Sequence, residues 1–423
     1  MAAGAALLDR IMGRIITRGT LSIVYADGQH ILLGMPEAGF PDVCIRLADK
    51  KVVRQIISDP RLGAGEAYID GRLIIEKGDV MELVGMLRAN RPWERGVTLH
   101  STGLVRTIFD RVMAARKSIN HKSLAKANVA HHYDIGNALY QLMLDSEHMQ
   151  YSCAYWPRDD MTLGHAQEAK LAHIAAKLAL QPGQRVLDIG CGWGGMAIYL
   201  AHNFDVSVKG ITLSEEQLSL AEKRAQDAGV SDYVRFELMD YRDLAKRKIT
   251  YDRIVSVGMF EHVGRPQFET FFRAASNLLN EDGVMLLHTI GRMGGPGSTD
   301  AFTRKYIFPG GYIPALSETV AASEKSRLIV TDVETLRLHY ARTLRQWYAR
   351  CMAQKSEIEA MFDDRFFRMW TFYLSGATAA FENGGMCNYQ IQYAKNRRTL
   401  PLTRDYIGES ERALLEDGSL LPE

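Results

Sequence analysis

The 423-residue chain has few of the features that mark several large classes of protein. Cysteine is scarce: its five residues, an odd number, are scattered and show no Cys-x-x-Cys spacing. This distribution argues against a disulfide framework and against a zinc site, and it fits a reducing cytosol. The net charge of +1 provides no global field that would favour a nucleic-acid partner.

Long hydrophobic runs are also missing. No window approaches the roughly 18 apolar residues that a membrane-spanning helix needs. The short apolar run at the N-terminus is broken by Asp9 and Arg10, so it predicts an amphipathic helix and not a secretory signal. We therefore expect a cytoplasmic protein whose membrane contact, if any, is peripheral.

The first 92 residues predict a small α+β module. Apolar and polar residues alternate as in strands over 21–25 and 30–33, and the intervening Asp27-Gly28 favours a hairpin. A further strand at 43–47, a helix at 49–59, a strand–turn–strand over 63–76 and a helix at 79–87 complete the expectation. The strand–turn–strand and helix that end this module resemble sterol-carrier-type lipid-binding modules. A packing or dimerisation domain is the alternative interpretation.

Residues 93–128 form a basic connector. Its cationic residues are Arg95, Arg106, Arg111, Arg116, Lys117, Lys122 and Lys126, and its acidic residues are only Glu94 and Asp110. Apolar residues recur at helical spacing between them. A basic amphipathic helix can lie on an anionic bilayer, whereas a solvated interdomain helix would show the same pattern.

From residue 129 to the C-terminus, the pattern predicts an α/β domain with a doubly wound parallel sheet. Expected strands lie at 185–189, 206–211, 234–239, 253–257 and 284–289. Expected helices between them lie at 166–180, 196–203, 215–228 and 267–280. This alternation is typical of βαβ units. Helices at 316–326, 343–361 and 365–382 and strands at 329–336 and 389–393 follow, and we expect a lipid-binding insertion at about 291–330.

A glycine-rich loop follows the first strand of this domain. Asp188 ends an apolar run, and Gly190, Gly192 and Gly194 follow at alternate positions. Glycine lets the backbone turn sharply and lets a ligand lie against the main chain, while the next helix N-terminus favours polar ligand groups. The spacing resembles motif I of the Rossmann-like class I S-adenosylmethionine-dependent methyltransferases. That resemblance implies that Cys191 also lines the cofactor site.

Other cofactor contacts follow from the same resemblance. Asp240 stands where that fold contacts adenine, and Tyr241 follows it. Many of these enzymes end the second strand with an acid that binds the ribose hydroxyls, but this chain has Thr212 and Leu213 there. We expect the Thr212 hydroxyl and the Gln217 amide, or water, to take over that contact.

A second set of motifs resembles the cyclopropane-fatty-acid-phospholipid synthase family over about residues 120–400. These motifs are 131–134 (HHYD), 151–156 (YSCAYW), 191–194 (CGWG), 210–214 (GITLS), 260–262 (FEH), 287–290 (LHTI) and 308–311 (FPGG). In that family, a cis double bond of an acyl chain attacks the sulfonium methyl group. The resulting carbocation loses a proton from the new methyl group, and the ring closes. The resemblance adds Tyr151 and Ser152 to the cofactor site.

The family resemblance also implies bicarbonate as the base. Its pocket would comprise Cys153, Glu261, His288, the backbone at Ile290, and Tyr340. Glu261 and His288 can both hydrogen-bond an anion only if at least one is protonated, so we expect perturbed pKa values. Their places near strand ends fit the rule that ligands bind beyond the carboxyl ends of parallel strands. Cys153 as a small core residue and Tyr340 as a packed aromatic are the structural alternatives.

The chain departs from the family at Ala377, where many members carry a cysteine. The absence of that thiol argues against a covalent enzyme intermediate and leaves open a product other than a cyclopropane. Alternatives to cyclopropanation are fatty-acyl C-methylation, small-molecule N-methylation, and lipid carriage without catalysis. We expect phospholipid acyl chains as substrate, and avidity at a bilayer favours a homodimer.

Overall fold

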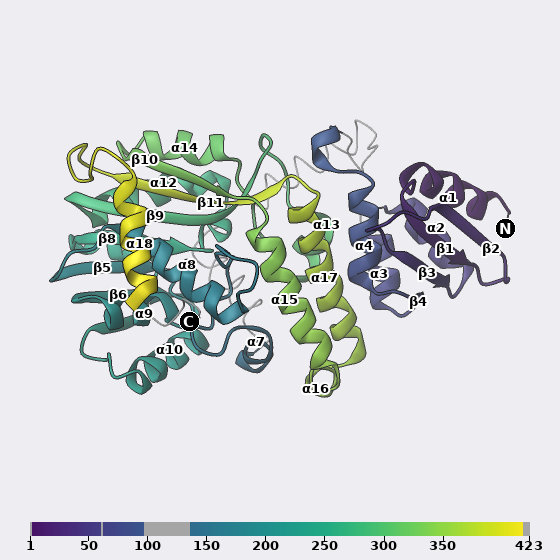
Figure 1. Cartoon of the computed structure of the whole chain (residues 1–423), viewed down its shortest axis with the longest axis horizontal. Helices are drawn as coiled ribbons and strands as arrows, with labels where there is room; N and C mark the ends of the chain where they lie inside the picture. Colours follow the sequence, from purple (N-terminus) through teal and green to yellow (C-terminus); the bar gives the residue numbers. More distant parts are fainter. Residues whose placement is uncertain (1, 61, 97–135, 418–423) are drawn as a thin grey trace. The chain divides into compact units, whose positions relative to one another are not determined.

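The computed structural model describes residues 2–60, 62–96 and 136–417 (Figure 1). Contacts divide the chain into two compact units, of which the first contains residues 1–107, 299–309 and 341–385 and the second contains residues 108–298, 310–340 and 386–423. Both units are therefore discontinuous in sequence. The expected boundaries, with one catalytic domain over 129–423, differ from this grouping because two later segments pack with the N-terminal residues.

The first unit contains a four-stranded sheet in the order β2-β1-β3-β4. Its strands are β1 (Gly19–Val24), β2 (His30–Met35), β3 (Asp42–Leu47) and β4 (Leu73–Lys77). Its helices are α1 (Ala2–Ile15), α2 (Lys50–Ser58), α3 (Gly63–Ile69), α4 (Val80–Ala89), α13 (Ala301–Tyr306), α16 (Lys355–Met361), α17 (Asp364–Glu382) and most of α15 (His339–Ala353), with the short 3-10 turn η1 (Trp93–Arg95). The predicted N-terminal helix and hairpin are confirmed.

One element of this unit was predicted wrongly. Residues 63–69, expected as a strand, form helix α3. Two glycines let that helix pack closely: a Cβ at Gly63 would lie 2.3 Å from the carbonyl oxygen of Gln55, and one at Gly65 would lie 2.9 Å from the ring of Phe372. Tertiary packing of this kind overrides a weak local preference.

The second unit contains a seven-stranded sheet in the order β10-β11-β9-β8-β5-β6-β7. Its strands are β5 (Gln184–Ile189), β6 (Val206–Thr212), β7 (Val234–Leu238), β8 (Tyr251–Val257), β9 (Leu279–Arg292), β10 (Ile329–Leu336) and β11 (Met386–Ala394). Strands β5 to β9 pair in parallel, and β10 and β11 close the edge in antiparallel register. This order is that of a class I methyltransferase sheet, which confirms the expected fold class.

Helices cover both faces of this sheet (Figure 1). They are α7 (Asn137–Met143), α8 (Leu163–Leu178), α9 (Gly195–Asn203), α10 (Glu215–Asp227), α11 (Tyr241–Leu244), α12 (Phe268–Leu278), α14 (Leu316–Glu324) and α18 (Asp405–Asp417), and the short 3-10 turns are η2 (Ala245–Arg247), η3 (Phe260–His262) and η4 (Arg265–Gln267). One apolar core packs α8, α9 and α10 on the sheet, and a second packs α12 and α14 on its other face. Such two-sided burial explains the near-continuous apolar runs of the parallel strands.

The topology places the ends of two strands side by side. The sheet grows from β5 to β6 in one direction and from β8 to β9 in the other, and β5 pairs directly with β8. This reversal is a topological switch point, where open α/β sheets bind ligands beyond the strands' carboxyl ends. The glycine loop follows β5, and Glu261 follows β8. In the part of the chain described, no helix is long and apolar enough to span a bilayer.

Candidate active site

The glycine loop after β5 is a cradle that side chains would block. Gly190, Gly192 and Gly194 all have positive φ angles, of 84°, 53° and 80°. A Cβ at Gly190 would lie 2.7 Å from Met259, and one at Gly194 would lie 2.6 Å from the ring of Phe236. The loop is held to β6 because the backbone N–H groups of Gly190 and Cys191 both donate to the carbonyl of Ile211, at 2.9 and 3.1 Å.

Asp188 is buried at the end of β5, and its Oδ2 has no hydrogen-bond partner among the described residues. Burial raises the pKa of this carboxyl group to about 7, although the nearby Lys170 ammonium opposes the shift. A buried carboxylate oxygen without a partner is costly unless a ligand satisfies it. The carboxylate is thus suited to accept hydrogen bonds from the ammonium group at the methionine end of the expected cofactor.

The predicted cofactor residues before α8 are anchored by buried polar groups. The Nζ of Lys170 donates to the Oγ of Ser152 at 3.1 Å and also bonds the Gln150 side chain. The amide of Gln167 donates to the Ser152 carbonyl at 3.0 Å. Burial lowers the pKa of Lys170 to about 7. These bonds fix the backbone that carries Tyr151 and Cys153.

An aromatic contact joins this segment to the glycine loop. The ring of Tyr140 packs against Tyr151 at 5.1 Å and against Trp193 at 4.9 Å between ring centroids. The indole N–H of Trp193 donates to the side chain of Asn137 at 2.8 Å. Two sequence segments predicted to bind one cofactor are therefore brought together around Tyr140.

The end of β6 lacks an acid, and two polar side chains are paired there instead. The Oγ1 of Thr212 donates to the Oε1 of Gln217 over 2.9 Å, and both residues are buried. Leu213, which follows Thr212 in the sequence, is half-buried. Ser214 caps α10 by accepting the N–H of Gln217. The expected ribose-binding pair thus exists as a preformed contact.

Asp240 and Tyr241 are more constrained than the sequence suggested. The Asp240 carboxylate accepts hydrogen bonds from the Arg242 backbone N–H and guanidinium, the latter at 2.6–2.8 Å. The ring of Tyr241 packs edge-on against Phe271, at 5.4 Å, within the core under α12. A role for either residue at adenine remains a prediction.

The carboxylate of Glu261 is buried directly against β9. Its Oε1 accepts the backbone N–H of Ile290 at 2.5 Å, and its Oε2 has no partner in the described part of the chain. Burial raises the pKa of Glu261 to about 7, and the bond from Ile290 opposes that shift. The ring of Phe260, stacked on Phe268 at 4.3 Å, anchors the turn that carries the carboxylate.

His288 lies inside β9 and not near its end, because the strand continues to Arg292. Its side chain is buried; Nδ1 contacts the amide of Gln390 at 3.2 Å, and Nε2 has no partner within the described ranges. Burial lowers the pKa of His288 to about 3, so the imidazole is neutral at pH 7. The predicted pKa perturbation of both residues is therefore present, in opposite directions.

Cys153 and Tyr340 complete the predicted set. The Cys153 thiol is buried, donates to the Ala154 carbonyl at 3.3 Å, and has its pKa raised by burial. It is therefore a protonated donor and not a thiolate. Tyr340 is buried at the start of α15, and its place at the reacting centre remains a prediction.

Two of these groups present hydrogen-bonding atoms that fit a small anion. The unpartnered Oε2 of Glu261 and Nε2 of His288 both belong to buried residues; Glu261 follows the end of β8, and His288 lies within the adjacent strand β9. A protonated carboxyl and a neutral imidazole N–H can each donate one hydrogen bond. The donor set thus fits bicarbonate. The N–H of Ile290, however, is already used by Glu261.

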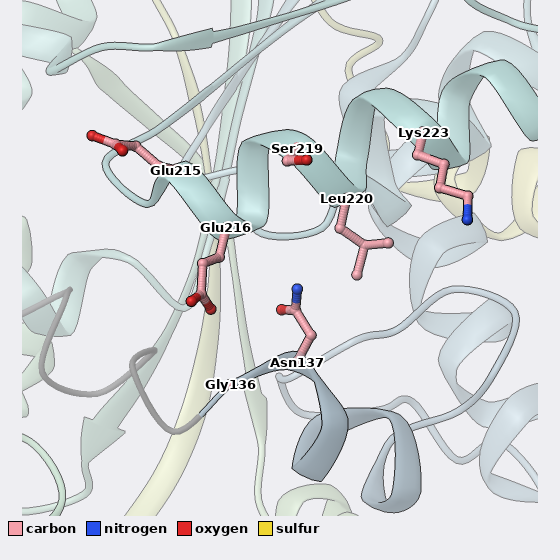
Figure 2. Close-up of a pocket in the computed structure, with 7 residues that line it drawn as sticks. All are labelled: Gly136, Asn137, Glu215, Glu216, Ser219, Leu220 and Lys223. Carbon is pink, nitrogen blue, oxygen red and sulfur yellow. The ribbon is translucent and has the colours of Figure 1, made fainter.

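A separate hollow lies between the start of α7 and α10 (Figure 2). Its lining residues are Gly136, Asn137, Glu215, Glu216, Ser219, Leu220 and Lys223. Figure 2 shows the Asn137 side chain pointing toward α10. No lining residue belongs to the predicted site, although Asn137 also bonds Trp193 of the glycine loop.

Sequence analysis missed three buried polar residues around the site: Lys170, Lys177 and Gln390. The two lysines are seven residues apart on α8 with His173 between them, which places all three near one face of the helix. Polar residues that recur on one face of an otherwise apolar helix were the available signal. No sequence pattern marks Gln390, because its contact with His288 arises only from the pairing of β11 with β9.

Comparison with known proteins gives consistent results. The family model for mycolic acid cyclopropane synthetase matches residues 120–391. The cyclopropane-fatty-acyl-phospholipid synthase of Escherichia coli K12 is 39% identical over 83% of this chain and 87% of its own. A probable fatty acid methyltransferase of Pseudomonas putida is 36% identical over 90% of this chain and 94% of its own.

A solved structure is similar as well. The mycolic acid cyclopropane synthase CmaA1, crystallised with SAH and CTAB, superimposes with a TM-score of 0.59 at 35% identity, and the match covers 63% of this chain and 97% of that one. Nearly all of that structure therefore has a counterpart in this chain, whereas part of this chain has none in that structure.

Proposed function

Because the chain belongs to the mycolic acid cyclopropane synthetase family and is an S-adenosylmethionine-dependent methyltransferase, we propose that it converts cis double bonds of phospholipid acyl chains to cyclopropanes. The observation that carries the proposal is Glu261: a buried carboxyl group with a pKa of about 7, whose Oε2 has no partner among the described residues. It follows β8, which pairs with the strand that leads into the glycine loop. Methyl transfer to an amine or hydroxyl also releases a proton, but from nitrogen or oxygen, whereas ring closure must remove one from carbon and therefore needs a base held at the reacting centre.

The net reaction requires the site to remove one proton. The alkene loses its π bond and gains two C–C bonds, the S–CH3 bond breaks with its electron pair left on sulfur, and one C–H bond of the transferred methyl group breaks. Bicarbonate, when bound, would supply an anionic base for that proton. Glu261 in its protonated form and His288 as a neutral donor would hold the anion, and burial would exclude water that could trap a cationic acyl chain.

A covalent enzyme intermediate has no role in this proposal. The Cys153 thiol is buried with a raised pKa, so it is a poor nucleophile. Position 377 carries alanine. The site therefore acts by holding and orienting the reactants around a bound anion.

Phospholipid as the substrate implies peripheral contact with a membrane surface. The basic connector proposed for that contact lies almost wholly outside the described residues. Association with anionic bilayers and assembly into a homodimer thus remain predictions from composition and avidity.

One difference from the family sequence favours a second class of product, a methylated chain without a ring. Ala377 replaces the cysteine of many family members, and the Pseudomonas putida relative is called a probable fatty acid methyltransferase. The alternative is methyl transfer without ring closure, which would give a methyl-branched or methylated unsaturated chain. It uses the same donor and the same acyl substrate.

Lipid analysis by mass spectrometry distinguishes these outcomes. The chain is expressed in cells rich in unsaturated phospholipid, with Glu261→Gln as the inactive variant and Glu237→Gln, a surface ion-pair residue, as the matched control. Gain of one CH2 with loss of the double bond supports cyclopropanation, and the same gain with the double bond kept supports methylation. Unchanged lipids with the native chain and the control would refute both.

A further inference from the structure

A polar row crosses three neighbouring strands under α8. In the antiparallel register, His288 of β9 lies directly opposite Gln390 of β11, and Gln390 lies directly opposite Glu334 of β10. Directly opposite residues in antiparallel strands project from the same face of the sheet. The three side chains therefore form one line that begins at the site and runs to the sheet edge.

Lys177 of α8 covers the middle of this row. Its Nζ donates to the Oε1 of Gln390 at 2.9 Å and forms an ion pair with Glu334. Lys177 and Gln390 are both buried. His173, one helical turn earlier, contacts the same Glu334 carboxylate through Nε2 at 2.6 Å. The row is thus held by charge-assisted hydrogen bonds from one helix.

These contacts fix the direction of the Gln390 amide. An ammonium group can only donate hydrogen bonds, so the amide oxygen must face Lys177. The amide nitrogen, which can only donate, then faces the Nδ1 of His288 at 3.2 Å. An Nδ1 that accepts a hydrogen bond carries no proton, and a neutral imidazole then carries its proton on Nε2.

We propose that Gln390, oriented by Lys177, is a positioning residue that fixes His288 as the Nε2–H tautomer, so that His288 donates its remaining hydrogen bond into the active site. The Nε2 atom is the one that has no partner among the residues described. What that N–H binds rests on the proposed function, in which the acceptor is a small anion. In the other tautomer, a lone pair would face the anion, and the contact would be repulsive.

Burial and most of the charged groups around His288 favour the neutral imidazole. Burial and the positive charges of Lys170, Lys177 and His173 disfavour the imidazolium form, and only Glu334 favours it. The tautomer, not the charge, is therefore the property that the row controls. A glutamine is suited to this because its two ends are opposite in hydrogen-bond polarity, whereas a carboxylate can only accept.

Selective ¹⁵N-histidine labelling and long-range ¹H–¹⁵N NMR test the tautomer on the full chain without substrate. The His288 signals are assigned by their loss in His288→Asn. We expect the wild type to show a protonated Nε2 and an unprotonated Nδ1. Gln390→Glu should reverse this, because a carboxylate beside Nδ1 requires a proton there. Gln390→Met removes the amide N–H that Nδ1 accepts and puts no other polar group in its place, so both tautomers should be populated.

The chain offers a matched control on the same strand. Gln392 is two residues away, is equally buried, and bonds Tyr406 and the Lys177 carbonyl but not His288. Gln392→Met should leave the His288 tautomer unchanged. Each variant's thermal unfolding is measured in parallel, so that a change in tautomer is read only on folded protein.

Turnover provides the second measurement. Gln390→Glu should lower kcat by about 10-fold or more while S-adenosylmethionine affinity stays near wild type, and Gln392→Met should retain activity. An Nδ1–H tautomer in the wild type, or an unchanged tautomer in Gln390→Glu, would overturn the proposal. A wild type with the expected tautomer but no lipid product would instead refute the proposed function and leave the role of Gln390 standing.

Discussion

The Oε1 atom of Glu261 accepts the backbone N–H of Ile290 over 2.5 Å, and this bond fastens the turn after β8 to the neighbouring strand β9. The bond leaves Oε2 as the free end of a buried carboxyl group. One residue thus connects the two strands on one side of the switch point and presents a proton-handling atom there. The N–H of Ile290 holds Glu261, and the backbone at Ile290 as part of an anion pocket stays a prediction.

Glu261 should make the stability of the ligand-free protein depend on pH. Its folded-state pKa of about 7 lies above the value of an exposed glutamate, so the folded state holds its proton more tightly. Stability is therefore highest at acid pH with respect to this group and is lost as pH rises from about 4.5 through 7, by roughly 3 kcal/mol at most. Urea unfolding at several pH values measures the loss.

Glu261→Gln removes the titration while keeping an oxygen for the N–H of Ile290. We expect the variant to equal the wild type near pH 4, to be more stable at pH 8, and to lack methyl transfer. Glu237→Gln, at a half-buried ion pair with Lys209, is the control. Because Lys209 lowers the pKa of Glu237, this variant should not change the pH dependence between pH 5 and pH 8. Parallel stability curves for wild type and Glu261→Gln across this range would contradict the assignment.

Gly190 should be required for binding of the methyl donor as well as for folding. Alanine there would have a positive φ and a Cβ within 2.7 Å of Met259. We expect a loss of stability of about 1–2 kcal/mol from the backbone alone, a further loss from the clash, and strongly weakened S-adenosylmethionine binding by calorimetry.

Gly183 separates these effects. It has a similar φ of 77°, but a Cβ there would meet nothing within 4 Å among the described residues. Gly183→Ala should thus show the backbone cost with unchanged donor affinity. Equal donor affinity in both alanine variants would show that the loop is not the donor site.

The parallel sheet could be predicted from sequence because its strands and helices alternate with opposite hydrophobic patterns. Strands β5, β6 and β8 begin and end within two residues of expectation, and β10 and β11 were also anticipated. Motif I supplied the loop at Gly190. Helix α3 was missed because its packing against residues distant in sequence, such as Phe372, is invisible locally.

The sequence identified candidate residues that the structure shows to be buried, but it did not predict the contacts between them. Glu261 and His288 follow from their motifs, and their opposite pKa shifts follow from burial. Two of these contacts depend on how β9 pairs with its neighbours: the bond from the Ile290 N–H to Glu261, and the contact between Gln390 and His288. Strand register across long insertions is not encoded in any short stretch of sequence.

Lys170 should strengthen the binding of S-adenosylmethionine by keeping Asp188 ionised. The ammonium favours the ionised form of Asp188, whose pKa is about 7, and it also holds Ser152. Lys170→Met should raise the pKa of Asp188 further and keep it protonated at pH 7. Because a carboxylate binds polar donor groups better than a carboxylic acid does, we expect about 10-fold weaker S-adenosylmethionine binding at pH 7.

The pH dependence distinguishes charge from simple damage. At pH 9 the Asp188 of Lys170→Met should ionise, so titration calorimetry should show part of the lost affinity restored. Lys209→Met, which breaks a pair with Glu237, is the control and should bind normally at both pH values. Affinity that is equally weak at pH 7 and pH 9 would mean that Lys170 acts through packing alone.

Cys153 should behave as a protonated, shielded thiol. Burial raises its pKa, and its Sγ donates to the Ala154 carbonyl. Of the five cysteines, Cys44 is half-buried, and Cys153, Cys191, Cys351 and Cys387 are buried. The pKa of Cys44 is also raised, by burial and by Glu76, so its labelling should be slow. Because the reagent must reach a thiolate, iodoacetamide at pH 8 should still label half-buried Cys44 in the native protein and leave Cys153 unmodified until unfolding, as peptide mass spectrometry would show.

Catalysis should likewise survive loss of the sulfur nucleophile. Cys153→Ser keeps a hydrogen-bond donor of similar size, so we expect a reduced but measurable kcat, whereas Glu261→Gln should be inactive. Intact-protein mass spectrometry during turnover should show no methylated or acylated enzyme. Rapid native labelling of Cys153, or a covalent adduct lost in Cys153→Ser together with all activity, would mean that the thiol attacks the substrate and that the anion-centred mechanism is wrong.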